Sequence, residues 1–182
     1  MKPETLIIGG ALVVAIAAGG RSQAQATHPF TPIQQVLQSP RCMNCHPSGD
    51  APLQTDASRP HKMNIKRVFG ELGGSCQTCH QDAAMPGDHM PPGAPHWGMP
   101  PAATPMVFQG KSASQLCVDL KDASKNGGRS LDDLRHHMTG ASPDPLVAWG
   151  FNPGPGRTVP PLSYAAFSAA VDTWVNAGGP CP

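Results

Sequence analysis

Cys42-Met43-Asn44-Cys45-His46 and Cys76-Gln77-Thr78-Cys79-His80 are two copies of one pattern, Cys-x-x-Cys-His. In a helical turn, residues i, i+3 and i+4 project from the same side. The two thiols of each copy can therefore bond to one edge of a porphyrin, while the imidazole that follows reaches the iron as its proximal ligand. This pattern is the attachment signature of c-type haem. It predicts two covalently bound haem c groups, with Cys42, Cys45, Cys76 and Cys79 as thioether residues and His46 and His80 as proximal iron ligands.

Cys-x-x-Cys pairs also occur in redox dithiols and in zinc sites. Zinc ribbons separate their pairs by about 15–20 residues, whereas the longer segment 46–75 lies between these two pairs. Zinc also has no need of a His directly after both pairs. A thioredoxin-like dithiol needs a βαβ context, and no alternation of strand and helix patterns is visible. The spacing therefore favours haem.

The first 26 residues have the pattern of an export signal. A charged start precedes an apolar run over residues 6–18, and Ala24-Gln25-Ala26 supplies a small-x-small cleavage site. We expect a signal peptide over residues 1–26 and one domain over residues 27–182. The alternative is an uncleaved anchor, in which residues 6–18 associate with the inner membrane, because Glu4 offsets the charge of Lys2. Both alternatives predict an exported, periplasmic protein.

Composition and charge restrict the function further. Without residues 1–26 the chain has equal numbers of acidic and basic residues, so no basic field attracts nucleic acid. The chain has 20 Gly and 22 Pro but only five Phe, three Trp and one Tyr. Such a composition makes it difficult to bury enough apolar surface, and two porphyrins are expected to supply the missing surface.

The two cysteines outside the repeated pattern are Cys117 and Cys181. In an oxidising compartment a remaining pair usually forms a disulfide. We therefore expect a bond between them that holds the C-terminus against the middle of the chain. The alternative is two free thiols.

Helical patterns are concentrated in the second half of the chain. A short helix is expected within residues 27–41, and residues 47–75 and the Pro-rich stretch 85–106 are expected to be irregular. Further helices are expected after the capping residues Ser112 and Ser130, with ends at Gly127-Gly128 and Gly140. A loop is expected over residues 142–161, and a last helix from about Ser163 to Asn176. No strand pattern is visible. The expected fold is mainly α with extensive irregular Pro/Gly-rich loops, a single compact domain of a dihaem c-type cytochrome.

The distal iron ligands are less well defined by the sequence. His137 shares the apolar face of its predicted helix with Leu134 and Met138, whereas His136 points elsewhere; the alternative role for His137 is that of a core histidine with its hydrogen bonds satisfied. The candidate distal ligands are His61, His89 and His137, with Met63 and Met90 as weaker candidates. We expect Met99, Met106 and His96 to be packing or surface residues. Two His ligands give a low-potential haem, and a Met ligand raises the potential.

Several segments are similar to one family, the small bacterial proteins labelled isoquinoline 1-oxidoreductase subunit. The resemblance spans nearly all of residues 27–182 and includes positions His61, His89 and His137. It implies a dihaem cytochrome that takes electrons from a periplasmic molybdenum hydroxylase. The matching segments are His28-Pro29-Phe30-Thr31-Pro32-Ile33, Arg41-Cys42 to His46-Pro47, Arg59-Pro60-His61 with Met63-Asn64, His89-Met90-Pro91-Pro92-Gly93-Ala94-Pro95 with Trp97, Asn126-Gly127-Gly128-Arg129, Asp144-Pro145-Leu146-Val147 to Arg157, and Gly178-Gly179-Pro180-Cys181-Pro182.

The expected function is electron relay rather than catalysis of bond chemistry. Two closely spaced haems and many candidate distal ligands favour a carrier between redox protein partners, from a donor dehydrogenase to a respiratory acceptor such as a cytochrome or oxidase. One alternative is a haem subunit of a larger membrane respiratory or photosynthetic complex, held by residues 6–18. The other is a haem peroxidase, in which one iron keeps an open face; known dihaem peroxidases are considerably longer chains.

Overall fold

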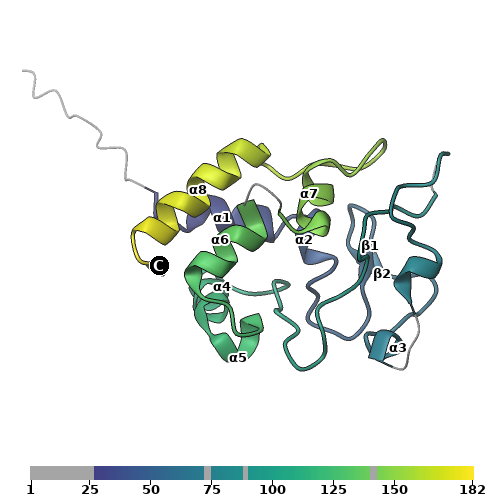
Figure 1. Cartoon of the computed structure of the whole chain (residues 1–182), viewed down its shortest axis with the longest axis horizontal. Helices are drawn as coiled ribbons and strands as arrows, with labels where there is room; N and C mark the ends of the chain where they lie inside the picture. Colours follow the sequence, from purple (N-terminus) through teal and green to yellow (C-terminus); the bar gives the residue numbers. More distant parts are fainter. Residues whose placement is uncertain (1–26, 72–74, 88–89, 140–142) are drawn as a thin grey trace, which may run out of the picture.

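A group of helices packs around one apolar core in the computed structural model, which describes residues 27–71, 75–87, 90–139 and 143–182 (Figure 1). The helices of this group are α1 (Thr31–Leu37), α4 (Ala113–Lys121), α6 (Leu131–Thr139) and α8 (Tyr164–Asn176). Helix α8 contacts both α1 and α6, and α1 also contacts α4. The predicted stripe of Phe167, Val171 and Trp174 on α8 is buried at the centre of this core.

The helix boundaries follow the capping signals of the sequence. Ser112 and Gln115 form a reciprocal capping box at the start of α4. The Ser130 hydroxyl accepts a bond from the Asp133 N–H at 3.1 Å, and Ser163 caps α8 in the same way. The short helix α5 (Ala123–Asn126) ends at Gly127, whose φ of 78° favours glycine. The predicted helix starts after Ser112 and Ser130 and the predicted end at Gly127 are confirmed, but the helix expected from Ser112 to Gly127 is divided at Asp122, whose backbone is extended and whose side chain caps α5. The predicted end at Gly140 lies outside the described residues.

The rest of the described chain has short elements joined by irregular segments (Figure 1). It holds α2 (Pro40–Met43), β1 (Leu53–Gln54), β2 (Arg59–Pro60), α3 (Val68–Glu71), the 3-10 helix η1 (Cys76–Thr78) and α7 (Pro145–Phe151). The prediction of a mainly helical chain with extensive irregular structure is confirmed.

Two local predictions were wrong. Helix α7 lies within the predicted loop 142–161, because Asp144 Oδ1 accepts the Leu146 N–H at 2.8 Å and Pro145 provides a helix-compatible first residue. Strands β1 and β2 form a small antiparallel hairpin, with Leu53 opposite Pro60, where no strand was expected. Its two-residue strands are too short to produce a visible alternation of apolar and polar residues.

The apolar core is distributed unevenly. The helical group buries a continuous apolar core, although the composition predicted difficulty in burying enough apolar surface. Among the described residues 48–107, by contrast, Ala94 is the one buried hydrophobic side chain. Met63, Val68, Phe69 and Met85 in this segment are exposed. The middle segment is therefore not stabilised by an apolar core of its own.

Cys117 and Cys181 form the expected disulfide, with their Cα atoms 5.5 Å apart. The Cys117 side chain is fully buried on α4. Lys121 Nζ donates to the Gly179 carbonyl at 2.8 Å, and Trp174 Nε1 donates to the Pro180 carbonyl at 2.9 Å. The C-terminal segment is thus held against α4 and α8.

None of the helices in the part of the chain that the structure describes is long and apolar enough to cross a membrane. Residues 1–26, with the apolar run 6–18, lie outside the described residues. The predicted signal peptide or anchor stays a prediction.

Replacing both Cys117 and Cys181 by Ala should lower the free energy of unfolding by about 4 kcal/mol, since the bond closes a loop with a sequence separation of 64 residues. Urea denaturation of the variant and the parent protein measures this difference. Alkylation of the unfolded, unreduced parent should leave both thiols unlabelled. Labelling of both would contradict the assigned bond.

Candidate functional site

Both Cys-x-x-Cys-His segments form a helical turn. In the first, which begins in α2, Cys45 N–H donates to the Cys42 carbonyl at 3.2 Å and His46 N–H donates to the Met43 carbonyl at 3.0 Å. In the second, which begins in η1, Cys79 and His80 both donate to the Cys76 carbonyl, at 3.2 and 2.9 Å. The predicted helical turn is thus present in both motifs, and such a turn allows residues i, i+3 and i+4 to project from one side.

The His46 ring is held by a segment distant in sequence. Its Nδ1 lies 2.7 Å from the Met106 carbonyl oxygen, and the Phe108 ring stacks on it with a centroid separation of 3.9 Å. The Phe108 N–H in turn donates to the His46 carbonyl at 2.9 Å. Burial lowers the pKa of His46 to about 4, so the ring is neutral at physiological pH.

The His80 ring has a matching environment. Its Nδ1 lies 2.8 Å from the Pro92 carbonyl oxygen, and the Trp97 ring stacks on it with a centroid separation of 4.6 Å and an interplanar angle of 3°. Burial is again the main cause that lowers the pKa of His80.

These contacts determine the tautomer of both rings. A carbonyl oxygen can only accept, so Nδ1 of His46 and of His80 must donate its hydrogen. In the neutral ring, Nε2 then carries the lone pair. Metal-binding histidines commonly donate their other ring N–H to a carbonyl in this way. The two residues predicted as proximal ligands are therefore prepared to bind a metal through Nε2, which fits haem iron.

The first cysteine pair is unlike a redox dithiol. Burial raises the pKa of Cys42 to about 12 and that of Cys45 to about 11, whereas reactive Cys-x-x-Cys thiols have lowered pKa values.

Within the described residues, no group of three or more His, Cys, Asp or Glu side chains is placed to bind a metal ion.

The two turns lie close to each other. Burial is the main cause of the raised pKa of the Cys45 thiol, and Cys76 of the second turn is near enough for its charge to raise this pKa as well. Aromatic contacts also connect them: Trp97, stacked on His80, meets Trp149 of α7 edge-on at 4.7 Å. The guanidinium of Arg41, directly before Cys42, lies 5.8 Å from the centroid of the Trp149 ring. The sequence pattern gave no indication of this role of Trp149, because residues 142–161 were expected to form a loop.

The β1–β2 hairpin is attached to the first turn. Leu53 N–H donates to the Asn44 carbonyl, and Asn44 Nδ2 donates to the Thr55 carbonyl, both at 2.9 Å. The Arg41 side chain, which is only 4% exposed, pairs with the Asp56 carboxylate in the turn of the hairpin. The middle segment is therefore held by polar contacts to residues within and beside the first turn.

The candidate distal ligands His61 and His137 lie in different surroundings. The rings of His61 and His80 have centroids 6.1 Å apart. His137 is half-buried beside the buried Leu134 and Met138, with Nδ1 3.7 Å from an Asp144 carboxylate oxygen.

Two of the remaining candidates are described. Met63 is 71% exposed, and Met90 is half-buried with its carbonyl accepting from Arg157 at 3.0 Å. His89 lies outside the described residues.

His137 is close enough to His46 to affect it electrostatically. The charge of His137 contributes to the lowered pKa of His46, after burial, and the Asp144 carboxylate opposes this effect. Burial also lowers the pKa of His137 itself, and Asp144 again opposes it. The expected separation from His136 is confirmed, since His136 is exposed.

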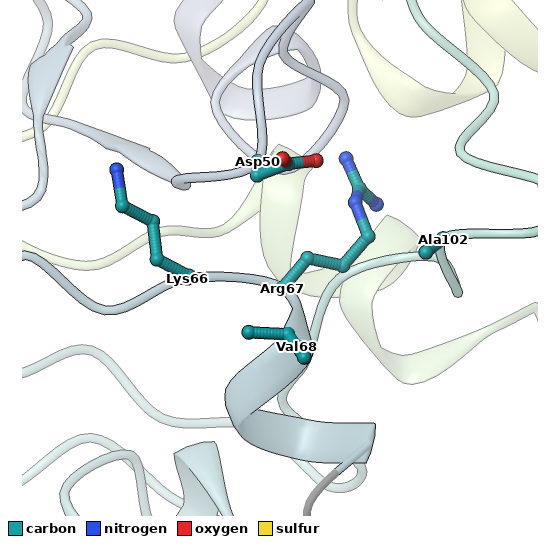
Figure 2. A pocket seen from close by; sticks show the side chains of 5 residues that line it. All are labelled: Asp50, Lys66, Arg67, Val68 and Ala102. Atoms are coloured by element: carbon teal, nitrogen blue, oxygen red, sulfur yellow. The ribbon is translucent and has the colours of Figure 1, made fainter.

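Two hollows lie next to each other, and the smaller one adjoins the second turn. One, of 180 Å³, is lined by Cys76, Trp97 and Met99 among others, so Met99 lies nearer this turn than the sequence indicated. The other, of 380 Å³, shares Lys66 and Arg67 with the first. Figure 2 shows Lys66 and Arg67 extending from the chain before α3 on either side of Asp50, with Ala102 beyond Arg67. The space beside Cys76 is thus open and bordered by both apolar and charged side chains.

The chain matches no protein-family model, no curated protein and no solved structure. The family resemblance and what it implies stay predictions.

Replacing Asp56 by Asn should lower the free energy of unfolding by about 2 kcal/mol, because it leaves the buried Arg41 guanidinium without its counter-charge. The matched control is Asp132→Asn, which breaks the exposed pair with Arg135 and should cost less than about 0.5 kcal/mol. Urea denaturation of both variants measures the two losses. Equal losses would show that the hairpin does not depend on the Arg41–Asp56 pair.

Proposed function

We propose that this protein is an exported dihaem c-type cytochrome that relays single electrons between redox proteins. The observation that carries this proposal is the repeated environment of His46 and His80. In both turns a backbone carbonyl fixes the Nδ1–H and an aromatic ring stacks on the imidazole. Two proximal haem ligands require two imidazoles that are each held in this way and that each directly follow a Cys-x-x-Cys pair.

The attachment chemistry uses the four motif thiols. Each thiol would add across one vinyl group of a haem, with sulfur bonding to one vinyl carbon and hydrogen to the other, so the addition would need no oxidant or reductant. Cys42 and Cys45 would hold one haem, and Cys76 and Cys79 the other. The bound haem supplies reversible one-electron chemistry at its iron. The chain holds the imidazoles in place and sets the polarity around each site.

The closeness of the two turns supports relay within the molecule. The Cys45–Cys76 interaction and the aromatic contacts from Trp97 through Trp149 to Arg41 are consistent with two haems side by side. His137 stays a candidate distal ligand because it is half-buried beside Leu134 and Met138 on α6. Asp144 would orient the His137 ring as a carboxylate partner.

The partners follow from the resemblance and the charge balance. The resemblance names a molybdenum hydroxylase-type dehydrogenase as donor, and a periplasmic cytochrome or a terminal oxidase would accept the electrons. The near-neutral charge predicts docking through local contacts at an exposed haem edge. Association with either partner should therefore depend only modestly on salt.

Mass spectrometry of protein produced in cells that mature c-type cytochromes should show two covalent haems. The double variants Cys42→Ala/Cys45→Ala and Cys76→Ala/Cys79→Ala should each carry one haem, because each cysteine pair serves a separate attachment site. The pyridine haemochrome spectrum gives an independent haem count. One haem, or none, in the unaltered protein would disprove the dihaem assignment.

A second measurement separates relay from catalysis. Both haems should accept and release electrons reversibly in a mediated redox titration. Turnover with hydrogen peroxide and an electron donor should stay near the background of a six-coordinate cytochrome. Substantial peroxidase turnover by the purified protein would instead support the enzyme alternative.

A further inference from the structure

We propose that His61 is the second axial ligand of the haem held by Cys76, Cys79 and His80. This inference rests on the proposed function. It selects one ligand from a set that the sequence left open, and it assigns that ligand to one of the two haems.

The separation of the two rings supports the pairing. A metal–imidazole bond is about 2 Å long and a ring centroid lies about 1.2 Å behind its Nε2, so two axial imidazoles on one iron have centroids about 6.3 Å apart. The observed separation between the His61 and His80 rings is 6.1 Å. Their interplanar angle of 60° is compatible with this, because each ring can rotate about its bond to the iron.

The hairpin explains how His61 reaches this position. His61 directly follows β2, and its N–H donates to the Pro52 carbonyl at 3.1 Å. The hairpin in turn is held to the first turn through Asn44 and the Arg41–Asp56 pair. A short, doubly anchored segment therefore carries the imidazole from the first haem-attachment turn to the second.

Other potential ligands fit less well. Met63 is 71% exposed, and His96 of the same region is exposed with a φ of 61°. Met99 lines the hollow beside Cys76 and is the strongest competitor. Among the described residues, His61 is the histidine whose ring is found near that of His80.

One contact would change on binding. Nδ1 of His61 accepts the Met63 N–H at 3.3 Å, whereas an imidazole bound to iron through Nε2 carries a hydrogen on Nδ1. This bond is at the long end of the range for hydrogen bonds and lies within a turn at the surface. A small shift of the 61–63 backbone would open it and release Nδ1 to donate to water.

Carbon monoxide binding to the reduced protein tests the ligand. The unaltered protein should bind little, because both irons are six-coordinate. In His61→Asn, one of the two haems should become reactive, and its ferric spectrum should change from low-spin to high-spin. Added imidazole should restore the low-spin spectrum. His96→Asn is the matched control and should behave as the unaltered protein does.

The possible outcomes separate the two proposals. The pairing is supported if the protein holds two haems and carbon monoxide binds one of them in His61→Asn, but neither in the unaltered protein nor in His96→Asn. Unchanged carbon monoxide binding in His61→Asn, or opening of a haem by Met99→Leu instead, overturns it. A haem count below two in the unaltered protein refutes the proposed function itself.

A second variant keeps the test decisive if His61→Asn fails to retain both haems. His61→Met keeps a side chain that can bind iron, and a thioether ligand raises the potential of a haem relative to bis-His ligation. One of the two midpoint potentials should rise in this variant. Two unchanged midpoint potentials would overturn the assignment of His61.

Discussion

The bond from each motif imidazole to a backbone carbonyl is the interaction on which the arrangement of the site depends. His46 donates to Met106 and His80 donates to Pro92, so each ring is fixed in direction and tautomer by a segment that does not belong to its own motif. Both acceptors lie in the Pro-rich stretch 85–106 or at its end. This stretch needs no regular structure for that task, because proline fixes its own φ and leaves its carbonyl free to accept. An irregular segment of this composition thereby supports two helical turns.

The two parts of the molecule are stabilised in different ways. The helices α1, α4, α6 and α8 bury a continuous apolar core and are cross-linked by the Cys117–Cys181 bond. The middle segment relies on specific polar contacts, such as Arg41 with Asp56, and leaves Met63, Val68, Phe69 and Met85 exposed. Two covalent haems in this region would bring apolar surface to the part of the chain that has the least of its own.

The two Cys-x-x-Cys-His turns also differ in their surroundings. The first lies beside α1 and α7, with thiols whose pKa values are raised by burial. The second is more open, since Cys79 is exposed and a hollow adjoins Cys76. Burial and polarity around a haem help to set its potential. Under the proposed function, two haems in these unequal surroundings would be suited to directional transfer, and the more open site would be the point of contact with a partner.

The sequence by itself determined the elements whose cause is local. Cys-x-x-Cys-His spacing predicts its own helical turn, and Ser112, Ser130 and Ser163 determine helix starts through bonds to residues within the next turn. The apolar stripe of α8 and the pairing of Cys117 with Cys181 followed from periodicity and from the cysteine count. The tertiary structure alone decided which carbonyl accepts from each imidazole, which ring stacks on it, and that His61 lies near His80 while Met63 faces solvent. These relations join residues far apart along irregular segments, where no periodicity exists to reveal which side chains meet, so only the folded path of the chain determines them.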